Sequence, residues 1–222
     1  MNTILVAGGT DGLGLEIVKL FAQDASKKIV VLGRNKQKLS AFGDRISFFR
    51  VDITRENDIK SFAEQFQDQI QTLIISVGIF GHGALTSFSY SQIRESIETN
   101  FLGHVFLTRA LLPKMAPQSR IVSINSISGV NPTKERSLLC GAKWGLRGFY
   151  YALSEELKGQ KIMVTQIFPG FFDSDYMDKV GIPKDKSKAI NKQLIAKQVV
   201  ELCALPQTIY VPEIQIKNIA YS

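Results

Sequence analysis

The sequence has no apolar run long enough to cross a lipid bilayer. Its longest runs, ILVA at 4–7 and IVVLG at 29–33, are far shorter than the roughly 20 residues that a membrane helix needs. The first residues lead straight into a strand-like segment, without a basic region followed by a long apolar one. We therefore expect no membrane span and no secretory signal.

Cysteine is scarce, with only two residues in a chain of 222. Cys140 and Cys203 form neither a disulfide framework nor the short-range pairs that are typical of a metal site. We therefore expect a protein of the reducing cytoplasm that holds no metal.

Acidic residues are outnumbered by basic ones, 20 to 27, which gives a formal net charge of +7. The basic residues are nevertheless scattered, and their densest cluster, KDKSK at 184–188, has no aromatic residues interleaved with it. Because no nucleic-acid-reading motif accompanies the charge, we expect no nucleic-acid partner. The phosphates of an anionic coenzyme are a sufficient reason for part of the positive charge.

Short apolar runs alternate with amphipathic stretches along the whole chain. The predicted strands are 2–7, 28–32, 46–50, 72–76, 119–125, 161–168 and 208–216. The predicted helices lie near 12–25, 35–42, 55–69, 89–116, 136–158 and 193–204. Near-continuous apolar strands are typical of a parallel sheet that helices cover on both faces. The alternation predicts a single Rossmann-type, doubly wound α/β domain over 1–222, with its ligand at the carboxyl ends of the strands.

A glycine-rich turn follows the first predicted strand. The segment VAGGTDGLGLEI at 6–17 has the spacing G-x-x-x-G-x-G and opens an amphipathic helix. Glycines there permit a tight turn and let the backbone approach a pyrophosphate at the helix N-terminus, where free N–H groups favour anions. A plain strand-to-helix turn is the alternative, but the strand and helix around the motif favour coenzyme binding. The predicted coenzyme contacts in this turn are Gly8, Thr10, Asp11, Gly12, Leu13 and Gly14.

The end of the second predicted strand bears on the choice between NADP and NAD. In VVLGRNKQKL, the sequence places Arg34 and Asn35 where an acidic residue would bond the ribose 2′-hydroxyl of NAD. A guanidinium can pair with a 2′-phosphate, so NADP(H) is preferred and NAD(H) remains possible. Asp11 argues against this preference, because a basic residue in the glycine turn would have strengthened it.

Two further coenzyme contacts are predicted just past the third strand, in VDIT at 51–54. Asp52 could accept a hydrogen bond from the adenine amino group, and Ile53 follows it. Asp52 could also cap the helix that begins near Arg55, and the two roles are compatible.

Further motifs resemble, in their order, those of the short-chain dehydrogenase/reductase family over nearly the whole chain. They are the glycine turn, LIISVG at 73–78, ETNFLG at 98–103, IVSINSISG at 121–129, GAKWG at 141–145 and FPGFFDS at 168–174. The sequence departs from the family pattern where Ala7 replaces a threonine and where Ile75, Ser76 and Val77 replace Asn-Asn-Ala before Gly78. The resemblance implies that a nicotinamide coenzyme exchanges hydride with a small carbonyl or alcohol substrate.

The resemblance also implies a role for each residue that matches a motif. Ser126 would hydrogen-bond the substrate oxygen, Lys143 would hold the nicotinamide ribose, and Asn100 would hold a water that connects Lys143 to solvent. A family tyrosine, whose pKa the lysine lowers, passes the proton to or from the substrate oxygen. The predicted contacts of the nicotinamide end are Gly78, Pro169, Gly170, Phe172 and Ser174.

The tyrosine is missing from this sequence. In the family it stands four residues before the lysine, one helical turn away, and that position is Leu139. No tyrosine occurs between Ser126 and Lys143, and Tyr150 and Tyr151 are too far along the helix to replace it. Leucine cannot carry a proton, and general acid–base catalysis contributes about 10²–10⁴ in rate.

Three interpretations follow from Leu139. In the first, which we favour, the chain is an oxidoreductase in which another group or a water, positioned by Ser126, Lys143 and Asn100, supplies the proton. In the second, it binds NADP(H) without turnover, as a redox-responsive module or a partner subunit. In the third, Lys143 reaches solvent at the edge of an apolar helix stripe and the dinucleotide is structural or vestigial. That stripe is Leu139, Ala142, Leu146, Phe149 and Leu153.

Two residues are candidates to replace the tyrosine. Cys140 is adjacent to Leu139 but points about 100° away around the helix, so a packing role is favoured. His82, in a GHG turn, is the better candidate, because its loop should lie beside the cleft and an imidazole titrates near neutral pH. A histidine exposed on a loop is the commoner case. His104 lies in an apolar helix and is predicted to be a hydrogen-bonded core residue.

The substrate end is expected to be closed by a lid. The segment 175–192 is polar and carries Gly181 and Pro183, as a lid would. The expected walls of the substrate pocket are 80–90, 127–139 and 171–190. Their Phe and Leu content favours a substrate with an apolar or aromatic group.

The predicted helix 136–158 also bears on assembly. Gly141, Gly145 and Gly148 would permit close approach of a neighbouring helix. Because such helices often form subunit interfaces in the resembled family, we expect a homodimer or a homotetramer.

Overall fold

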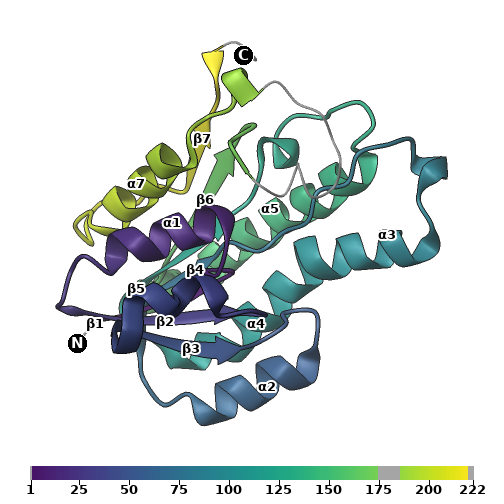
Figure 1. Cartoon of the computed structure of the whole chain (residues 1–222). Coiled ribbons are helices and arrows are strands. Elements are labelled where there is room, and N and C mark those ends of the chain that lie inside the picture. Colours follow the sequence, from purple (N-terminus) through teal and green to yellow (C-terminus); the bar gives the residue numbers. More distant parts are fainter. Residues whose placement is uncertain (1, 175–185, 220–222) are drawn as a thin grey trace.

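The computed structural model describes residues 2–174 and 186–219 and contains a seven-stranded parallel sheet (Figure 1). The strands are β1 Asn2–Ala7, β2 Lys27–Gly33, β3 Ile46–Arg50, β4 Ile70–Ile75, β5 Met115–Ile124, β6 Met163–Pro169 and β7 Glu213–Ile216. Their order across the sheet is β3-β2-β1-β4-β5-β6-β7. The order reverses between β1 and β4, and ligands of doubly wound sheets bind at such a point, beyond the carboxyl ends of the strands. The predicted fold class is confirmed.

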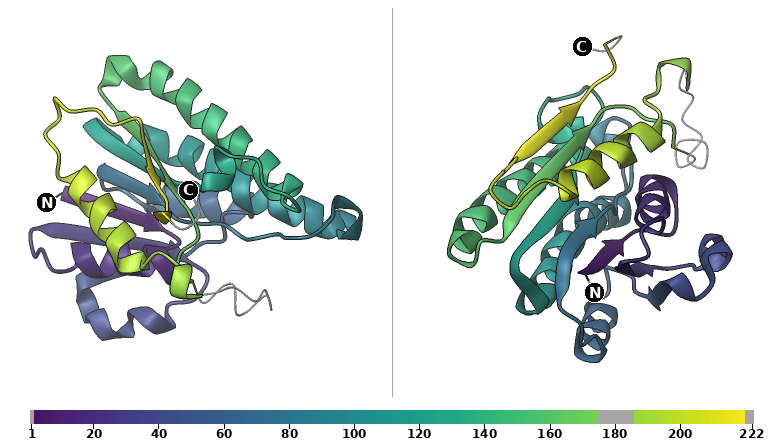
Figure 2. Two further views of the ribbon diagram at one scale, coloured as in Figure 1. Left: turned by 90° about the horizontal axis from the view of Figure 1, so that it is seen from above. Right: turned by 90° about the vertical axis from the view of Figure 1, so that its left-hand side faces the viewer.

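Helices cover both faces of the sheet (Figure 2). They are α1 Gly12–Phe21, α2 Glu56–Gln65, α3 Tyr90–Ile97, α4 Gly103–Leu111, α5 Ser137–Leu157 and α7 Lys192–Cys203. Side chains of β1 alternate between the two cores, with Ile4 and Val6 packed in the core under α1 and α7. Leu5 and Ala7 pack in the core under α2, α4 and α5. Because the residues of β1 from Ile4 to Ala7 are buried on one side of the sheet or the other, this stretch is apolar without interruption.

Several element boundaries differ from the prediction. Residues 208–212 are not strand, and Pro212, which has no N–H to donate to the ladder, directly precedes β7. The predicted helix 89–116 is interrupted by a π-helical turn, Glu98–Leu102. Helix α4 ends at Leu111, a 3₁₀ turn that contains Pro113 follows, and 115–116 belong to β5. Residues 37–45 form a 3₁₀ segment rather than an α-helix.

Candidate active site

A cavity of about 700 Å³ lies at the carboxyl ends of the strands on either side of the switch between β1 and β4. Most of the residues predicted for coenzyme binding and catalysis line it: Gly8, Thr10, Asp11, Gly12, Leu13, Arg34, Asp52, Ile53, Gly78, Asn100, Ser126, Leu139, Lys143, Pro169, Gly170, Phe172 and Ser174. Two predicted contacts lie outside its lining. Gly14 packs beneath Gly8, and the side chain of Asn35 accepts a hydrogen bond from the Gln37 N–H at 2.9 Å.

The glycine turn is packed so closely at Gly8 and Gly14 that neither position has space for a side chain. A Cβ at Gly8, whose φ is +79°, would lie 2.5 Å from the Ser76 carbonyl oxygen on the neighbouring chain segment. A Cβ at Gly14 would lie 2.2 Å from the Gly8 carbonyl oxygen. The turn therefore keeps its backbone against the end of β4 and brings the N-terminus of α1 to the cavity. A helix N-terminus presented in this way could hold a pyrophosphate.

The charge of Asp11 is paired within the cavity wall. Its carboxylate accepts hydrogen bonds from the Gly12 N–H at 2.8 Å and from Lys38 Nζ at 2.6 Å. Lys38 comes from the 3₁₀ segment after β2, and the sequence alone did not indicate this contact. Because the Lys38 ammonium offsets the Asp11 carboxylate, Asp11 repels a nearby phosphate less strongly than an unpaired carboxylate would.

Asp52 caps a turn rather than a helix. Its carboxylate accepts from the Thr54 N–H at 3.0 Å and from the Thr54 hydroxyl at 2.8 Å. Helix α2 begins after Arg55, which makes no side-chain cap, so the predicted helix-capping role of Asp52 is wrong. Partial burial raises the pKa of Asp52, but the hydrogen bonds from Thr54 and the positive charge of Arg34 outweigh it and hold that pKa below its ordinary value.

Lys143 carries its amino group into the floor of the cavity. Its side chain is only 4% exposed, and burial lowers its pKa from 10.5 to about 8. A Cβ on Gly78 would lie 3.5 Å from Lys143 Nζ and 3.0 Å from Asn100 Oδ1, so these three residues meet at one point. The interpretation in which Lys143 reaches solvent at the edge of the helix stripe is therefore wrong.

Asn100 is fixed by the π-helical turn. It is fully buried, its Oδ1 accepts from the Ile79 N–H at 3.0 Å and its Nδ2 donates to the Ile79 carbonyl at 3.0 Å. The extra residue of a π-helical turn re-aims the side chains around it, and such turns are frequent at functional sites. Both bonds hold the loop after β4 against Asn100.

Ser126 lies at the end of β5 and begins a short 3₁₀ turn, Ile127–Gly129. Its hydroxyl accepts from the Ser128 N–H at 3.1 Å, which fixes its rotamer at the cavity wall. The preceding Asn125 donates to the Lys143 carbonyl at 3.3 Å and to Gln166 Oε1 at 3.1 Å. These bonds hold the end of β5, helix α5 and β6 together.

Leu139 faces the same cavity, and it is 4% exposed. Tyr150 is instead buried in the core, where its hydroxyl lies 3.1 Å from the Thr108 hydroxyl. Tyr151 donates to the carboxylate of Glu213, the first residue of β7. No tyrosine of the described residues lines the cavity. Phe149 is only partly buried, so Tyr150 takes the place predicted for Phe149 on the buried face of α5.

The other candidates for proton transfer lie outside the cavity lining. His82 is on the adjoining loop, with Nε2 at 3.5 Å from a Glu135 carboxylate oxygen. Cys140 points elsewhere around α5. His104 is fully buried, as predicted, and its Nε2 hydrogen-bonds the Val77 carbonyl at 2.8 Å, while its Nδ1 has no partner. Burial and the charge of Lys143 lower the pKa of His104 to about 3, so it stays neutral.

The cavity also contains residues that the sequence did not indicate. Among them are Ser76, Val77, Ile79, Glu95, Glu98, Thr99 and Asn125, whereas Phe80, Arg136 and Phe171 fall within the predicted pocket walls 80–90, 127–139 and 171–190. Arg136 had a further signal, because it precedes Leu139 by three residues and Lys143 by seven and so shares one helix face with them. The residues that the sequence did not indicate depend on how the loops after β4 and β5 fold and on how the helical stretch 95–99 packs, which periodicity does not give.

Most of the predicted lid, 175–185, lies outside the described residues. Its remainder packs on the loop after β6, where Phe172 and Ile190 form a parallel bridge. The Lys192 N–H donates to the Asp173 carboxylate at 2.5 Å. These contacts anchor the start of α7 beside the cavity.

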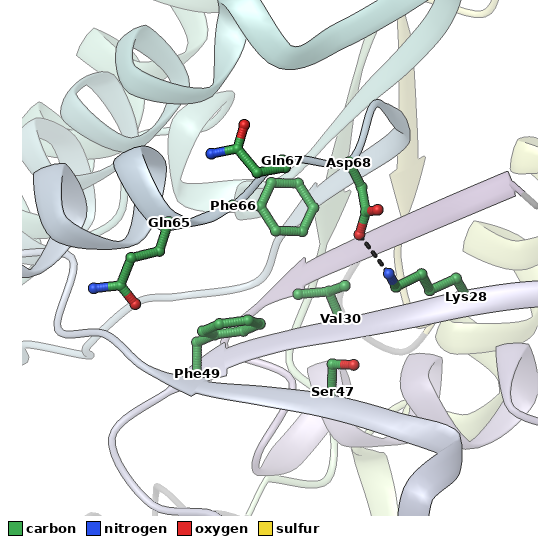
Figure 3. Close-up of a pocket in the computed structure, with 8 residues that line it drawn as sticks. All are labelled: Lys28, Val30, Ser47, Phe49, Gln65, Phe66, Gln67 and Asp68. Atoms are coloured by element: carbon green, nitrogen blue, oxygen red, sulfur yellow. Dashed lines mark ion pairs between the residues drawn. The ribbon is translucent and has the colours of Figure 1, made fainter.

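A second, smaller hollow of about 160 Å³ lies away from this cavity, at the amino ends of β2 and β3 (Figure 3). Lys28 and Asp68 form an ion pair across it at 2.6 Å. Its other walls are Val30, Ser47, Phe49 and the end of α2. Since its two charges already neutralise each other, it offers no free charge to a ligand.

Within residues 2–174 and 186–219, no group of three or more His, Cys, Asp or Glu side chains could hold a metal ion. No helix there is both long and apolar enough to span a membrane. Cys140 and Cys203 are both free thiols.

Comparisons with known proteins agree with this geometry. The family model described as short chain dehydrogenase matches residues 2–184. A 3-oxoacyl-[acyl-carrier-protein] reductase of Bos taurus is 28% identical over 204 residues, which cover 87% of this chain and 81% of that one. A short chain dehydrogenase family protein from Francisella tularensis superposes with a TM-score of 0.88 at 19% identity, covering 98% of each chain. The closed form of serine dehydrogenase complexed with NADP+ also gives 0.88, at 23% identity over 96% of this chain and 94% of that one.

We predict that Lys143→Met stabilises the protein at neutral pH. Lowering the pKa of the ammonium from 10.5 to about 8 corresponds to about 3 kcal/mol lost from the free energy of unfolding. This cost is complete below pH 8, where both states hold the proton. It fades between pH 8 and 10.5, where the native state has already released the proton. Denaturant unfolding from pH 7 to 10.5 should show the variant more stable at pH 7, by an amount that shrinks as the pH rises.

Lys134→Met is the control for this prediction, because Lys134 is exposed on the loop before α5. It should leave both the stability and its pH dependence unchanged. A Lys143→Met variant whose stability followed that of the unmodified protein at every pH would contradict the burial cost.

Proposed function

Since the chain belongs to the short chain dehydrogenase family, we propose that it is an oxidoreductase that transfers hydride between NADP(H) and a small carbonyl or alcohol substrate. The observation that carries the proposal is the cavity that has the glycine cradle at one end and Ser126, Asn100 and Lys143 together at the other. The bound coenzyme would supply or accept the hydride. The residues of the chain would orient the substrate and would donate or accept the proton.

The coenzyme end of the cavity fits a dinucleotide with a 2′-phosphate. The turn at Gly8 and Gly12, with Thr10 and Leu13, would hold the pyrophosphate on the N-terminus of α1. Asp52 and Ile53 would contact the adenine. Arg34 would pair with the 2′-phosphate, and the ion pair with Lys38 partly offsets the charge of Asp11, which argued against NADP. This supports a preference for NADP(H) over NAD(H).

The nicotinamide end would be held from two sides. Lys143 would donate to the ribose hydroxyls, and Gly78 gives its ammonium space to do so. The loop after β6, with Pro169, Gly170, Phe172 and Ser174, would hold the carboxamide. Ser126 would donate to the substrate oxygen, which fixes the carbonyl carbon for hydride transfer.

Leu139 would stand at the position of the family tyrosine, so we propose that a water molecule donates the proton to the substrate oxygen. This water would lie beside the Ser126 hydroxyl and the Lys143 ammonium. The lowered pKa of Lys143, about 8, lets Nζ release a proton at near-neutral pH and regain it from solvent by way of a water held by Asn100. In the reverse direction the same groups would accept the proton from an alcohol. Catalysis should be slow without a tyrosine phenol that is hydrogen-bonded directly to the substrate oxygen.

The whole chain, 1–222, would act as one coenzyme-binding domain in the cytoplasm, with 175–192 as substrate lid. A homodimer or homotetramer fits the outer face of α5. There, a Cβ at Gly141 or Gly148 would meet no atom of the described residues within 4 Å. The Trp144 side chain on this helix is 48% exposed.

We predict that NADPH binds more tightly than NADH and that Arg34→Leu removes the difference. Losing a charge-assisted pair to the 2′-phosphate should weaken NADPH binding by about 10- to 100-fold and leave NADH binding nearly unchanged. Titration by coenzyme fluorescence measures both. Arg45→Leu, which removes an exposed arginine outside the cavity, is the matched control. Equal affinity of the unmodified protein for both coenzymes would contradict the assignment of Arg34.

We further predict that Leu139→Tyr accelerates NADPH-dependent reduction of carbonyl compounds by about 10²–10⁴, because it restores a positioned acid. Ser137→Tyr, which adds a phenol at an exposed position two residues away, should not. Initial rates by loss of NADPH absorbance compare the three proteins. A rate no higher in Leu139→Tyr would contradict the assignment of that position. Turnover only in Leu139→Tyr would instead make the unmodified chain a non-catalytic NADP(H)-binding protein.

A further inference from the structure

Arg136 brings to the cavity a positive charge that the proposed reaction does not use. It stands directly before α5, and Arg136, Leu139 and Lys143 all line the cavity. Arg136 precedes Lys143 by seven residues, which corresponds to about 10 Å along the helix axis. Arg136 therefore marks the end of the cavity beyond Leu139, away from the coenzyme cradle.

Contacts between two loops hold Arg136 in place. Its guanidinium carbon lies 4.8 Å from the centre of the Phe80 ring, a cation–π contact. The Gly83 N–H donates to the Glu135 carbonyl at 2.8 Å, and Glu135 has a φ of 60°, in the left-handed region. A left-handed residue that is not glycine costs free energy. This turn closes the loop after β4 onto the start of α5.

The neighbouring carboxylates leave Arg136 uncompensated. Glu135, next to it in the sequence, places its carboxylate 3.5 Å from His82 Nε2 instead. Glu95 and Glu98 also line the cavity, but within residues 2–174 and 186–219 no ion pair joins either of them to Arg136. The Arg136 Nε is buried without a hydrogen-bond partner, and burial lowers the pKa of the guanidinium.

A half-buried guanidinium without a counter-ion is costly, and a bound carboxylate would remove the cost. Only the Nε of this guanidinium is a buried atom without a hydrogen-bond partner, and Arg136 lines the cavity, so a ligand there can approach its terminal nitrogens. We propose, on the basis of the function proposed above, that the substrate carries a carboxylate that pairs with Arg136 while its carbonyl group lies at Ser126. The substrate is then a carbonyl acid or hydroxy acid, rather than only apolar or aromatic as the walls alone predicted.

A pair of matched ligands tests this proposal. 4-Formylbenzoate and 4-formylbenzamide have nearly the same shape and differ in charge. The protein is first saturated with NADP+, which cannot reduce either aldehyde, and each ligand is then titrated by calorimetry. We expect the benzoate to bind at least about tenfold more tightly than the benzamide. Arg136→Met should bring the ratio close to one, and Arg136→Lys should retain part of it.

Lys134→Met is the matched control, because it removes a positive charge from the same loop but outside the cavity lining. It should keep the full preference for the benzoate. Equal binding of the two ligands to the unmodified protein, a preference that survives Arg136→Met, or no binding of the benzoate at millimolar concentration would each overturn the proposal. Failure of NADP+ to bind in the first step would contradict the proposed function instead, before either aldehyde is added.

Discussion

The close approach of backbone to backbone at the β1–β4 switch is the constraint on which the rest of the site depends. Gly8 rests on the Ser76 carbonyl and Gly14 rests on the Gly8 carbonyl, with no room for a Cβ at either position. This contact fixes where α1 begins relative to the end of β4. It thereby places the cradle for a pyrophosphate in the same cavity as Gly78, against which Asn100 and Lys143 are packed. A turn one side chain wider would separate the two ends of the site.

The second constraint is a positive charge held out of water. Lys143 is buried, its pKa falls to about 8, and the neighbouring His104 is kept neutral. Burying this charge lowers the stability of the fold. The arrangement is useful where an anionic or polar ligand replaces the interactions with water that the ammonium has lost. Leu139 adds an apolar wall beside this charge. The floor of the cavity thus favours the release of a proton from nitrogen, although it offers no phenol in the described part of the chain.

The sequence predicted the sheet, the helix layers and most of the cavity lining. These follow from apolar periodicity and from the glycines of the turn after β1, which allow close approach of the backbone. The prediction failed where the outcome depends on contacts between segments distant in the chain. The pairing of Asp11 with Lys38, the turn-capping role of Asp52 and the burial of Lys143 are of this kind. The π-helical turn at Asn100 was missed because a single extra residue hardly alters helical periodicity. Arg136 was expected only as part of the pocket wall 127–139, although its spacing from Lys143 pointed to a place on the same helix face.

The central claim is that this cavity transfers hydride without a tyrosine at position 139. The most direct measurement uses the unmodified protein, NADPH deuterated at its transferable position and a panel of aldehydes and ketones, with the product alcohols analysed by mass spectrometry. The account predicts one deuterium on the carbinol carbon of at least one alcohol. Coenzyme that binds but yields no deuterated alcohol from any member of the panel would contradict it.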